Sequence, residues 1–184
     1  MQKVFKIHLL LIFVAIFALF DSAQRQSLAQ SEQGPEIQDQ RETGSNSGLP
    51  IPRFVSIATG KARARTGPGL KYPVEWVYQR DGLPVQVIKE FDNWRKILDI
   101  DGQGGWIHVS LLSGERTALV NTSKYAVMRE APNKKSEAIA LLESDLVVEI
   151  ERCLDQWCRV RRADFSGWVE RNLLWGIYED EQIN

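Results

Sequence analysis

The chain has 184 residues, which is enough for one or two small domains. Its 23 basic and 24 acidic residues nearly cancel, so the sequence does not indicate a nucleic-acid-binding surface. With only two Cys and two His, the chain cannot build a zinc cluster from these residues, and no metal or other cofactor is expected.

The N-terminus resembles a secretory signal peptide. Two lysines precede an apolar run over residues 7–20, which is shorter than the roughly 20 residues that cross a membrane. Ser27 and Ala29 place small residues at −3 and −1 of a cleavage site after Ala29. We expect residues 1–29 to be removed and the rest to be periplasmic or secreted. The alternative is an uncleaved anchor, which would hold the protein at a membrane.

Residues 30–52 are rich in Gln, Glu, Ser and Gly and contain few large apolar side chains. Such a segment buries too little surface to offset the entropy of ordering, so a disordered linker is expected. It would serve either as a tether or as a plain spacer. The change in composition at Pro50 to Pro52 predicts that the folded part begins at Arg53.

A tryptophan-centred pattern occurs twice. Trp-Arg-Lys-Ile at 94–97 is followed by Gly-Trp-Ile at 105–107, and Trp-Cys-Arg-Val at 157–160 is followed by Gly-Trp-Val at 167–169. Each copy alternates apolar and polar residues around a turn, which is typical of two paired strands. An internal repeat of about sixty residues predicts two similar small domains in tandem.

The first domain is expected over residues 53–116. Its predicted strands cover 53–57, 63–66, 72–78, 83–91, 94–98 and 105–109. The loop Gly67-Pro68-Gly69 interrupts them, because Pro restricts φ while Gly permits tight turns.

The second domain is expected over residues 117–178, with strands in the same order. They cover 117–120, 125–131, 138–142, 146–154, 157–162 and 167–169. The two loop glycines of the first domain are absent here, which argues against binding by that loop. The acidic tail 179–184 is expected to fray.

These patterns resemble a known family. Arg65-x-Gly67-Pro68-Gly69, the Gly-x-x-Val-x-Val pattern that starts at Gly82, Trp94-x-Lys96-Ile97 and Gly105-Trp106-Ile107 are similar to the bacterial Src-homology-3 (SH3b) domain. The longer runs 72–78 and 105–114 resemble a subgroup of exported SH3-like proteins of α-proteobacteria. The resemblance covers nearly all of residues 53–178. It implies an all-β chain with two tandem SH3-like antiparallel barrels of five strands each.

The candidate ligand-binding residues are Arg65, Tyr72, Trp76 and Tyr78. In SH3-like barrels, ligands usually lie between this loop and an aromatic-lined face. The three aromatic residues share one face of a strand at period two, and Arg65 would supply charge. The alternative is that this face belongs to the core or packs on the second barrel.

Cys153 and Cys158 are expected to form a disulfide. The strands on either side of them are predicted to pair as a hairpin, with a four-residue loop between the two cysteines. Directly opposed residues in such a ladder approach the spacing that a disulfide needs, and export would supply an oxidising compartment.

The sequence shows no catalytic set, and the chain is not expected to be an enzyme. His108 is the only His outside the signal peptide, and no nucleophile or orienting residue accompanies it in a motif. The SH3b resemblance implies a non-catalytic envelope module that recognises a peptide or peptidoglycan. The alternative is a structural protein whose barrels pack on each other and on an envelope protein. The sequence does not identify the ligand.

Overall fold

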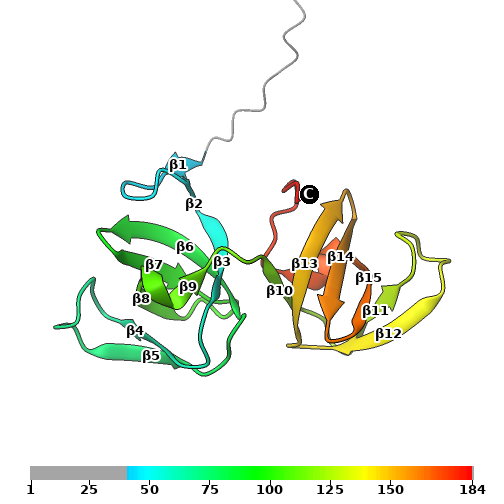
Figure 1. Cartoon of the computed structure of the whole chain (residues 1–184), viewed down its shortest axis with the longest axis horizontal. Helices are drawn as coiled ribbons and strands as arrows, with labels where there is room; N and C mark the ends of the chain where they lie inside the picture. The colour runs from blue at the N-terminus through cyan, green and yellow to red at the C-terminus, as the bar shows by residue number, and fades with distance from the viewer. Residues whose placement is uncertain (1–40, 184) are drawn as a thin grey trace, which may run out of the picture. The chain divides into compact units, whose positions relative to one another are not determined.

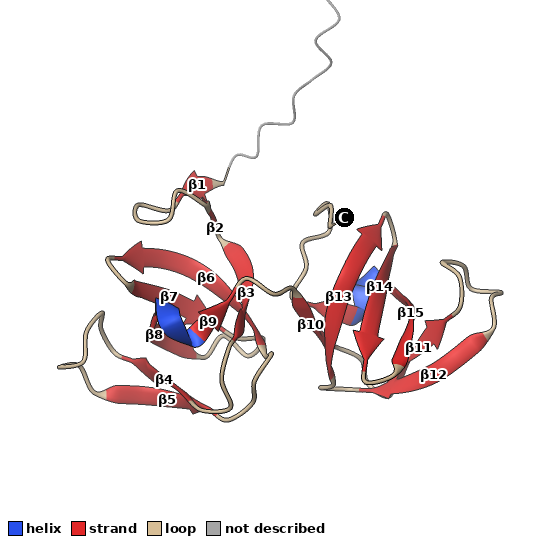
Figure 2. Ribbon diagram, in the orientation of Figure 1, coloured by secondary structure: helices blue, strands red, loops and turns tan. Residues whose placement is uncertain are grey.

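The computed structural model describes residues 41–183 (Figures 1 and 2). The predicted signal peptide and the predicted linker up to residue 40 lie outside these described residues. Over residues 41–183 the chain forms a two-stranded sheet and two seven-stranded antiparallel sheets, one for each repeat. The predicted all-β class with two tandem units is therefore confirmed.

The first barrel contains the strands of the first repeat. They are β3 (Arg53–Ile57), β4 (Ala62–Arg65), β5 (Val74–Tyr78), β6 (Pro84–Phe91), β7 (Trp94–Leu98), β8 (Gly104–His108) and β9 (Leu112–Ser113), with a 3₁₀ turn, η1 (Val109–Leu111), before β9. The ladder runs β5-β4-β8-β7-β6-β3-β9. Alternation along each strand turns one face inward. The fully buried core there includes Val85, Val87, Ile97 and Ile107.

The second barrel repeats this arrangement. Its strands are β10 (Thr117–Val120), β11 (Tyr125–Arg129), β12 (Ala138–Glu143), β13 (Val147–Leu154), β14 (Trp157–Arg162), β15 (Phe165–Glu170) and β16 (Leu174–Trp175), with η2 (Arg171–Leu173) before β16. The ladder runs β12-β11-β15-β14-β13-β10-β16. Each ladder has seven strands rather than the five that the resemblance implied, because the end strands β5 and β9, or β12 and β16, extend it.

The ladders of the two barrels match in register as well as in order. A bulge interrupts the β6–β7 ladder between Val87 and Lys89, and a bulge interrupts the β13–β14 ladder between Ile150 and Arg152. The two repeats therefore specify the same irregularities. This correspondence allows side chains at equivalent positions of the two barrels to be compared directly.

Residues 41–52 form a hairpin, so the prediction of a disordered linker up to Pro52 is wrong for this segment. Its strands are β1 (Glu42–Thr43) and β2 (Pro50–Ile51). The turn between them binds the buried carboxylate of Glu90, which accepts hydrogen bonds from the Asn46 N–H at 3.0 Å, the Ser47 N–H at 2.8 Å and the Ser47 hydroxyl at 2.7 Å. A carboxylate more than forty positions away thus orders this short polar segment.

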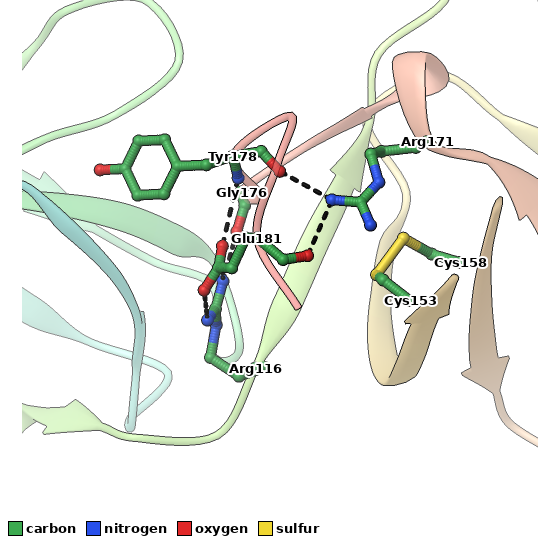
Figure 3. The surroundings of a disulfide bond; sticks show 7 residues. All are labelled: Arg116, Cys153, Cys158, Arg171, Gly176, Tyr178 and Glu181. Carbon is green, nitrogen blue, oxygen red and sulfur yellow. Dashed lines mark hydrogen bonds and ion pairs between the residues drawn. A yellow bond between two sulfur atoms is a disulfide. The ribbon is translucent and has the colours of Figure 1, made fainter. Parts of the chain in front are cut away.

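The C-terminal tail also folds back, contrary to the expectation that it would fray. Arg116 pairs with the Glu181 carboxylate, and Arg171 donates to the carbonyls of Tyr178 at 2.8 Å and Glu181 at 2.9 Å. Figure 3 shows these two arginines reaching the tail from two sides, near the disulfide. The Cys153 N–H donates to the carbonyl of Ile183 at 2.8 Å.

Several side chains connect the two barrels. Phe54 of β3 contacts the rings of Trp175 and Tyr178, with centroids 5.1 and 4.8 Å apart. The Gln86 amide donates to the Tyr178 hydroxyl at 2.8 Å. Tyr178 follows the last strand, so part of the contact depends on the folded tail.

Candidate functional site

Arg65 holds the loop between β4 and β5. Its Nη1 donates to the carbonyl of Tyr72 at 2.7 Å and to that of Leu70 at 3.2 Å. In the second barrel Arg129 occupies the same position and donates to the carbonyl of Ser136 at 2.8 Å. The predicted ligand-binding Arg65 is therefore also a structural clamp that both repeats use.

Tyr72 packs directly on the loop. A Cβ added to Gly67 would lie 2.5 to 2.7 Å from atoms of the Tyr72 ring. Gly67 is therefore required by this close approach, because its φ is not in the left-handed region. In the second barrel Ala131 replaces this glycine, and its N–H donates to the Ser136 hydroxyl at 2.9 Å in place of the aromatic contact. The half-buried Tyr72 shapes the loop in the first barrel alone.

Tyr78 lies in the core, which removes it from the candidate ligand-binding surface. Its side chain is 3% exposed, and its hydroxyl donates to Asp99 at 3.2 Å. Burial, followed by the charge and hydrogen bond of Asp99, raises the pKa of Tyr78 above its ordinary value. The alternative given in the sequence analysis, that this face belongs to the core, is therefore correct for Tyr78.

Trp76 lies two positions before Tyr78 on β5 and so on the same face, but it remains 43% exposed. Leu70 and Val74 are also exposed, so an apolar surface adjoins the clamped loop. β5 is the end strand of its ladder, and its outer edge has no strand partner among the described residues. The structure thus brings Arg65, Tyr72 and Trp76 together around one loop.

The second barrel lacks this exposed ring. Trp76 stands opposite Ala64 across the β4–β5 ladder, whereas Ala140 stands opposite Met128 at the equivalent positions. Met128 is fully buried. The larger residue of the pair is on the end strand β5 in the first barrel and on β11, which lies inside the ladder, in the second. Only the first barrel therefore presents an aromatic ring at this position.

The clamp makes a testable prediction. Replacing Arg65 with Met should lower the free energy of unfolding by about 1–2 kcal/mol, because it removes two charge-assisted hydrogen bonds from a partly buried site. Hydrogen exchange should become faster at the Thr66 and Tyr72 amides, which donate to Pro73 and Gly69 within the loop. Arg63→Met is the control, since Arg63 is exposed and makes no side-chain hydrogen bond in the described structure. Unchanged exchange in Arg65→Met would contradict the clamp.

The histidine singled out from the sequence has a structural role. His108 Nδ1 lies 2.7 Å from the Ser110 hydroxyl and accepts from the Ser110 N–H at 3.3 Å, which caps η1. Its ring lies edge-on against Trp94. Within residues 41–183, no group of three or more His, Cys, Asp or Glu residues could hold a metal ion, and no helix is long and apolar enough to cross a membrane.

One set of side chains was not predicted from the sequence. Trp106 was predicted only as part of the repeated pattern, and no role was expected for Lys89 or Lys96. The ladder places these three residues and Arg65 in one row across the outer face of the first barrel. Only the strand register reveals this row, because its members come from four separate strands.

Comparison with known proteins gives a family match. The model of the bacterial SH3 domain matches the chain twice, over residues 58–114 and 122–176. No curated protein matches the chain. Among solved structures, the chain is similar to NlpC2 from Trichomonas vaginalis, with 15% identity and a TM-score of 0.31. That match covers 67% of this chain and 48% of the other.

Proposed function

The chain belongs to the bacterial SH3 domain family, and from this premise we propose that it is an exported, non-catalytic module that recognises a peptide or peptidoglycan in the cell envelope. Domains of this family are generally binding modules. The first barrel is the proposed recognition unit. Its ligand would lie along the loop at residues 66–73 and the exposed end of β5.

The exposed indole of Trp76 carries this proposal. Large aromatic side chains that remain accessible are enriched among the residues that dominate binding energy. Leu70 and Val74 extend the apolar surface, and the open edge of β5 offers backbone groups to an extended peptide. Arg65 fixes the loop that borders this surface.

Charge also favours the first barrel. Residues 53–116 hold 10 basic and 7 acidic residues, a net charge of +3, whereas residues 117–178 hold 9 of each. An acidic peptide or a stem carboxylate would be attracted to the first barrel by this difference.

Export rests on the N-terminal pattern and agrees with the disulfide. Structural disulfides persist in oxidising compartments and are rare in the cytosol. Cys153 and Cys158 are bonded in the structure. We therefore propose that the protein acts in the periplasm or outside the cell, after removal of residues 1–29.

A structural role is the second candidate. The aromatic contact of Phe54 with Trp175 and Tyr178 favours it, because this contact joins the barrels without any ligand. Such a protein would present both barrels as one body to an envelope protein.

Trp76→Ala tests the first proposal. It should reduce retention on purified peptidoglycan at least tenfold, because a central aromatic anchor is lost. Phe91→Ala is the matched control. Phe91 is also an exposed aromatic residue of the first barrel, with 59% of its surface accessible, but it lies at the end of β6 and not on β5. Circular dichroism should show that both variants fold. If the unmodified protein is not retained, or if Trp76→Ala is retained normally, the structural role is favoured.

A further inference from the structure

The outer face of the first barrel carries a row of cations around a tryptophan. The ladder pairs Arg65 of β4 with Trp106 of β8, Trp106 with Lys96 of β7, and Lys96 with Lys89 of β6. Directly opposed residues lie on the same face of a sheet. Three strand spacings of about 4.8 Å make the row about 14 Å long. Ile97, the neighbour of Lys96, is fully buried on the opposite face.

The second barrel has the same row, but there one cation pairs with a carboxylate and another stacks on the tryptophan. Arg129, Trp168, Arg159 and Arg152 occupy the four equivalent positions. The Arg159 Nε donates to Glu151 at 2.9 Å, and the Arg152 guanidinium lies 5.1 Å from the centre of the Trp168 ring. Trp168 is only 4% exposed. In this barrel one cation of the row is therefore paired with a carboxylate, and the indole is covered.

The first barrel lacks this compensation. Ile88 takes the bulge position that Glu151 holds in the second barrel, and Gln86 stands where Glu149 does. Within residues 41–183, Arg65, Lys89 and Lys96 form no ion pair, and the carboxylate of Glu75, which lies over Gly105, contacts none of them closely enough to form one. Trp106 remains partly accessible.

An uncompensated pair of lysines is unfavourable for the fold. Like charges directly opposite each other in a ladder destabilise it, and the second barrel shows that the same register tolerates a carboxylate beside its cations. Uncompensated cations flanking an accessible indole are a combination suited to an anionic ligand. Because β7 and β8 are central strands, their backbone groups are already paired and cannot add a peptide strand.

We propose that this row binds an acidic glycan. The flat face of a sugar ring would pack on the Trp106 indole, and carboxylate or phosphate groups on neighbouring sugars would pair with the ammonium groups of Lys89 and Lys96. A surface on paired central strands suits a chain of rigid rings better than an acidic peptide, whose backbone needs an open edge. The row meets the surface assigned to peptide recognition at Arg65, which is directly opposite Val74, but Trp106, Lys96 and Lys89 lie on other strands.

Calorimetry at low ionic strength tests this inference with four probes. They are trigalacturonic acid, the uncharged trimer galactotriose, triaspartate and inorganic tripolyphosphate. Trigalacturonic acid should bind the unmodified protein most tightly, and galactotriose should not bind detectably. Lys89→Gln/Lys96→Gln should weaken trigalacturonate binding about tenfold, because it removes two ion pairs with the ligand. Lys124→Gln/Lys135→Gln, which removes the same charge from the second barrel, should leave the affinity unchanged.

Three results would overturn the inference. They are no binding of trigalacturonate, an unchanged affinity in the Lys89→Gln/Lys96→Gln variant, and binding of triaspartate or tripolyphosphate as tight as that of the sugar. Trp76→Ala should bind trigalacturonate normally. This arm separates the outer face from the peptide surface, so failure of either proposal leaves the other standing.

Discussion

Replacing Glu90 with Gln is expected to lower the free energy of unfolding by about 3 kcal/mol, because it removes the negative charge that pairs with both Arg53 and Arg95 in a buried cluster. The Glu90 carboxylate is fully buried and lies 2.8 Å from Arg53 Nη2 and 3.3 Å from Arg95 Nε. The backbone of Ser47 donates to the same carboxylate. The substitution would therefore weaken both the barrel and its contact with the N-terminal hairpin.

The pH dependence of stability provides a second measure of Glu90. Burial by itself would raise the pKa of this carboxyl, but hydrogen bonds from Ser47 and Asn46, together with Arg53, lower it from 4.5 to about 2. A lowered pKa contributes stability that is complete above pH 4.5 and is lost as the pH falls toward 2. Urea unfolding between pH 7 and pH 2 should show this loss in the native chain and little of it in Glu90→Gln.

Glu143→Gln is the control for this experiment. Glu143 is exposed and makes no ion pair in the described structure, so its substitution should change stability by less than about 0.5 kcal/mol. If Glu90→Gln unfolds at the same urea concentration as the native chain at pH 7, the buried cluster does not stabilise the barrel.

Removing the disulfide is expected to have the next largest effect. Cys153→Ala/Cys158→Ala should lower the free energy of unfolding by about 2 kcal/mol, since the bond closes a short loop in the unfolded chain. Both cysteines are fully buried and directly opposed in the β13–β14 ladder. Urea unfolding of the double variant and of the oxidised native chain measures the difference.

Alkylation of the secreted protein checks the bond itself. In denaturant without reductant, no alkyl group should be added, whereas two should be added once reductant is present. Addition of two groups before reduction would show that the bond is absent from the natural protein. In that case the proposed export would rest on the N-terminal pattern alone.

The two barrels use different chemistry at one position of the fold. Cys153 and Cys158 are opposed in the second barrel where Glu90 and Arg95 are opposed in the first. The ladder register makes Glu90, and not the neighbouring Phe91, the equivalent of Cys153. One hairpin is joined by a covalent bond and the other by a buried ion pair, and a terminal segment packs against each.

Features that depend on local pattern could be predicted from the sequence alone. The repeat, the all-β class and the disulfide follow from alternation and from a hairpin whose two cysteines are five positions apart. Tertiary structure decided the features whose partners are distant in the chain. Residues 41–52 are ordered by Glu90, and the packing around β5 buries Tyr78 while leaving Trp76 exposed. The outer row of cations also exists only because the register of four strands aligns its members. Such contacts depend on long-range pairing, which leaves no periodic signal in the sequence.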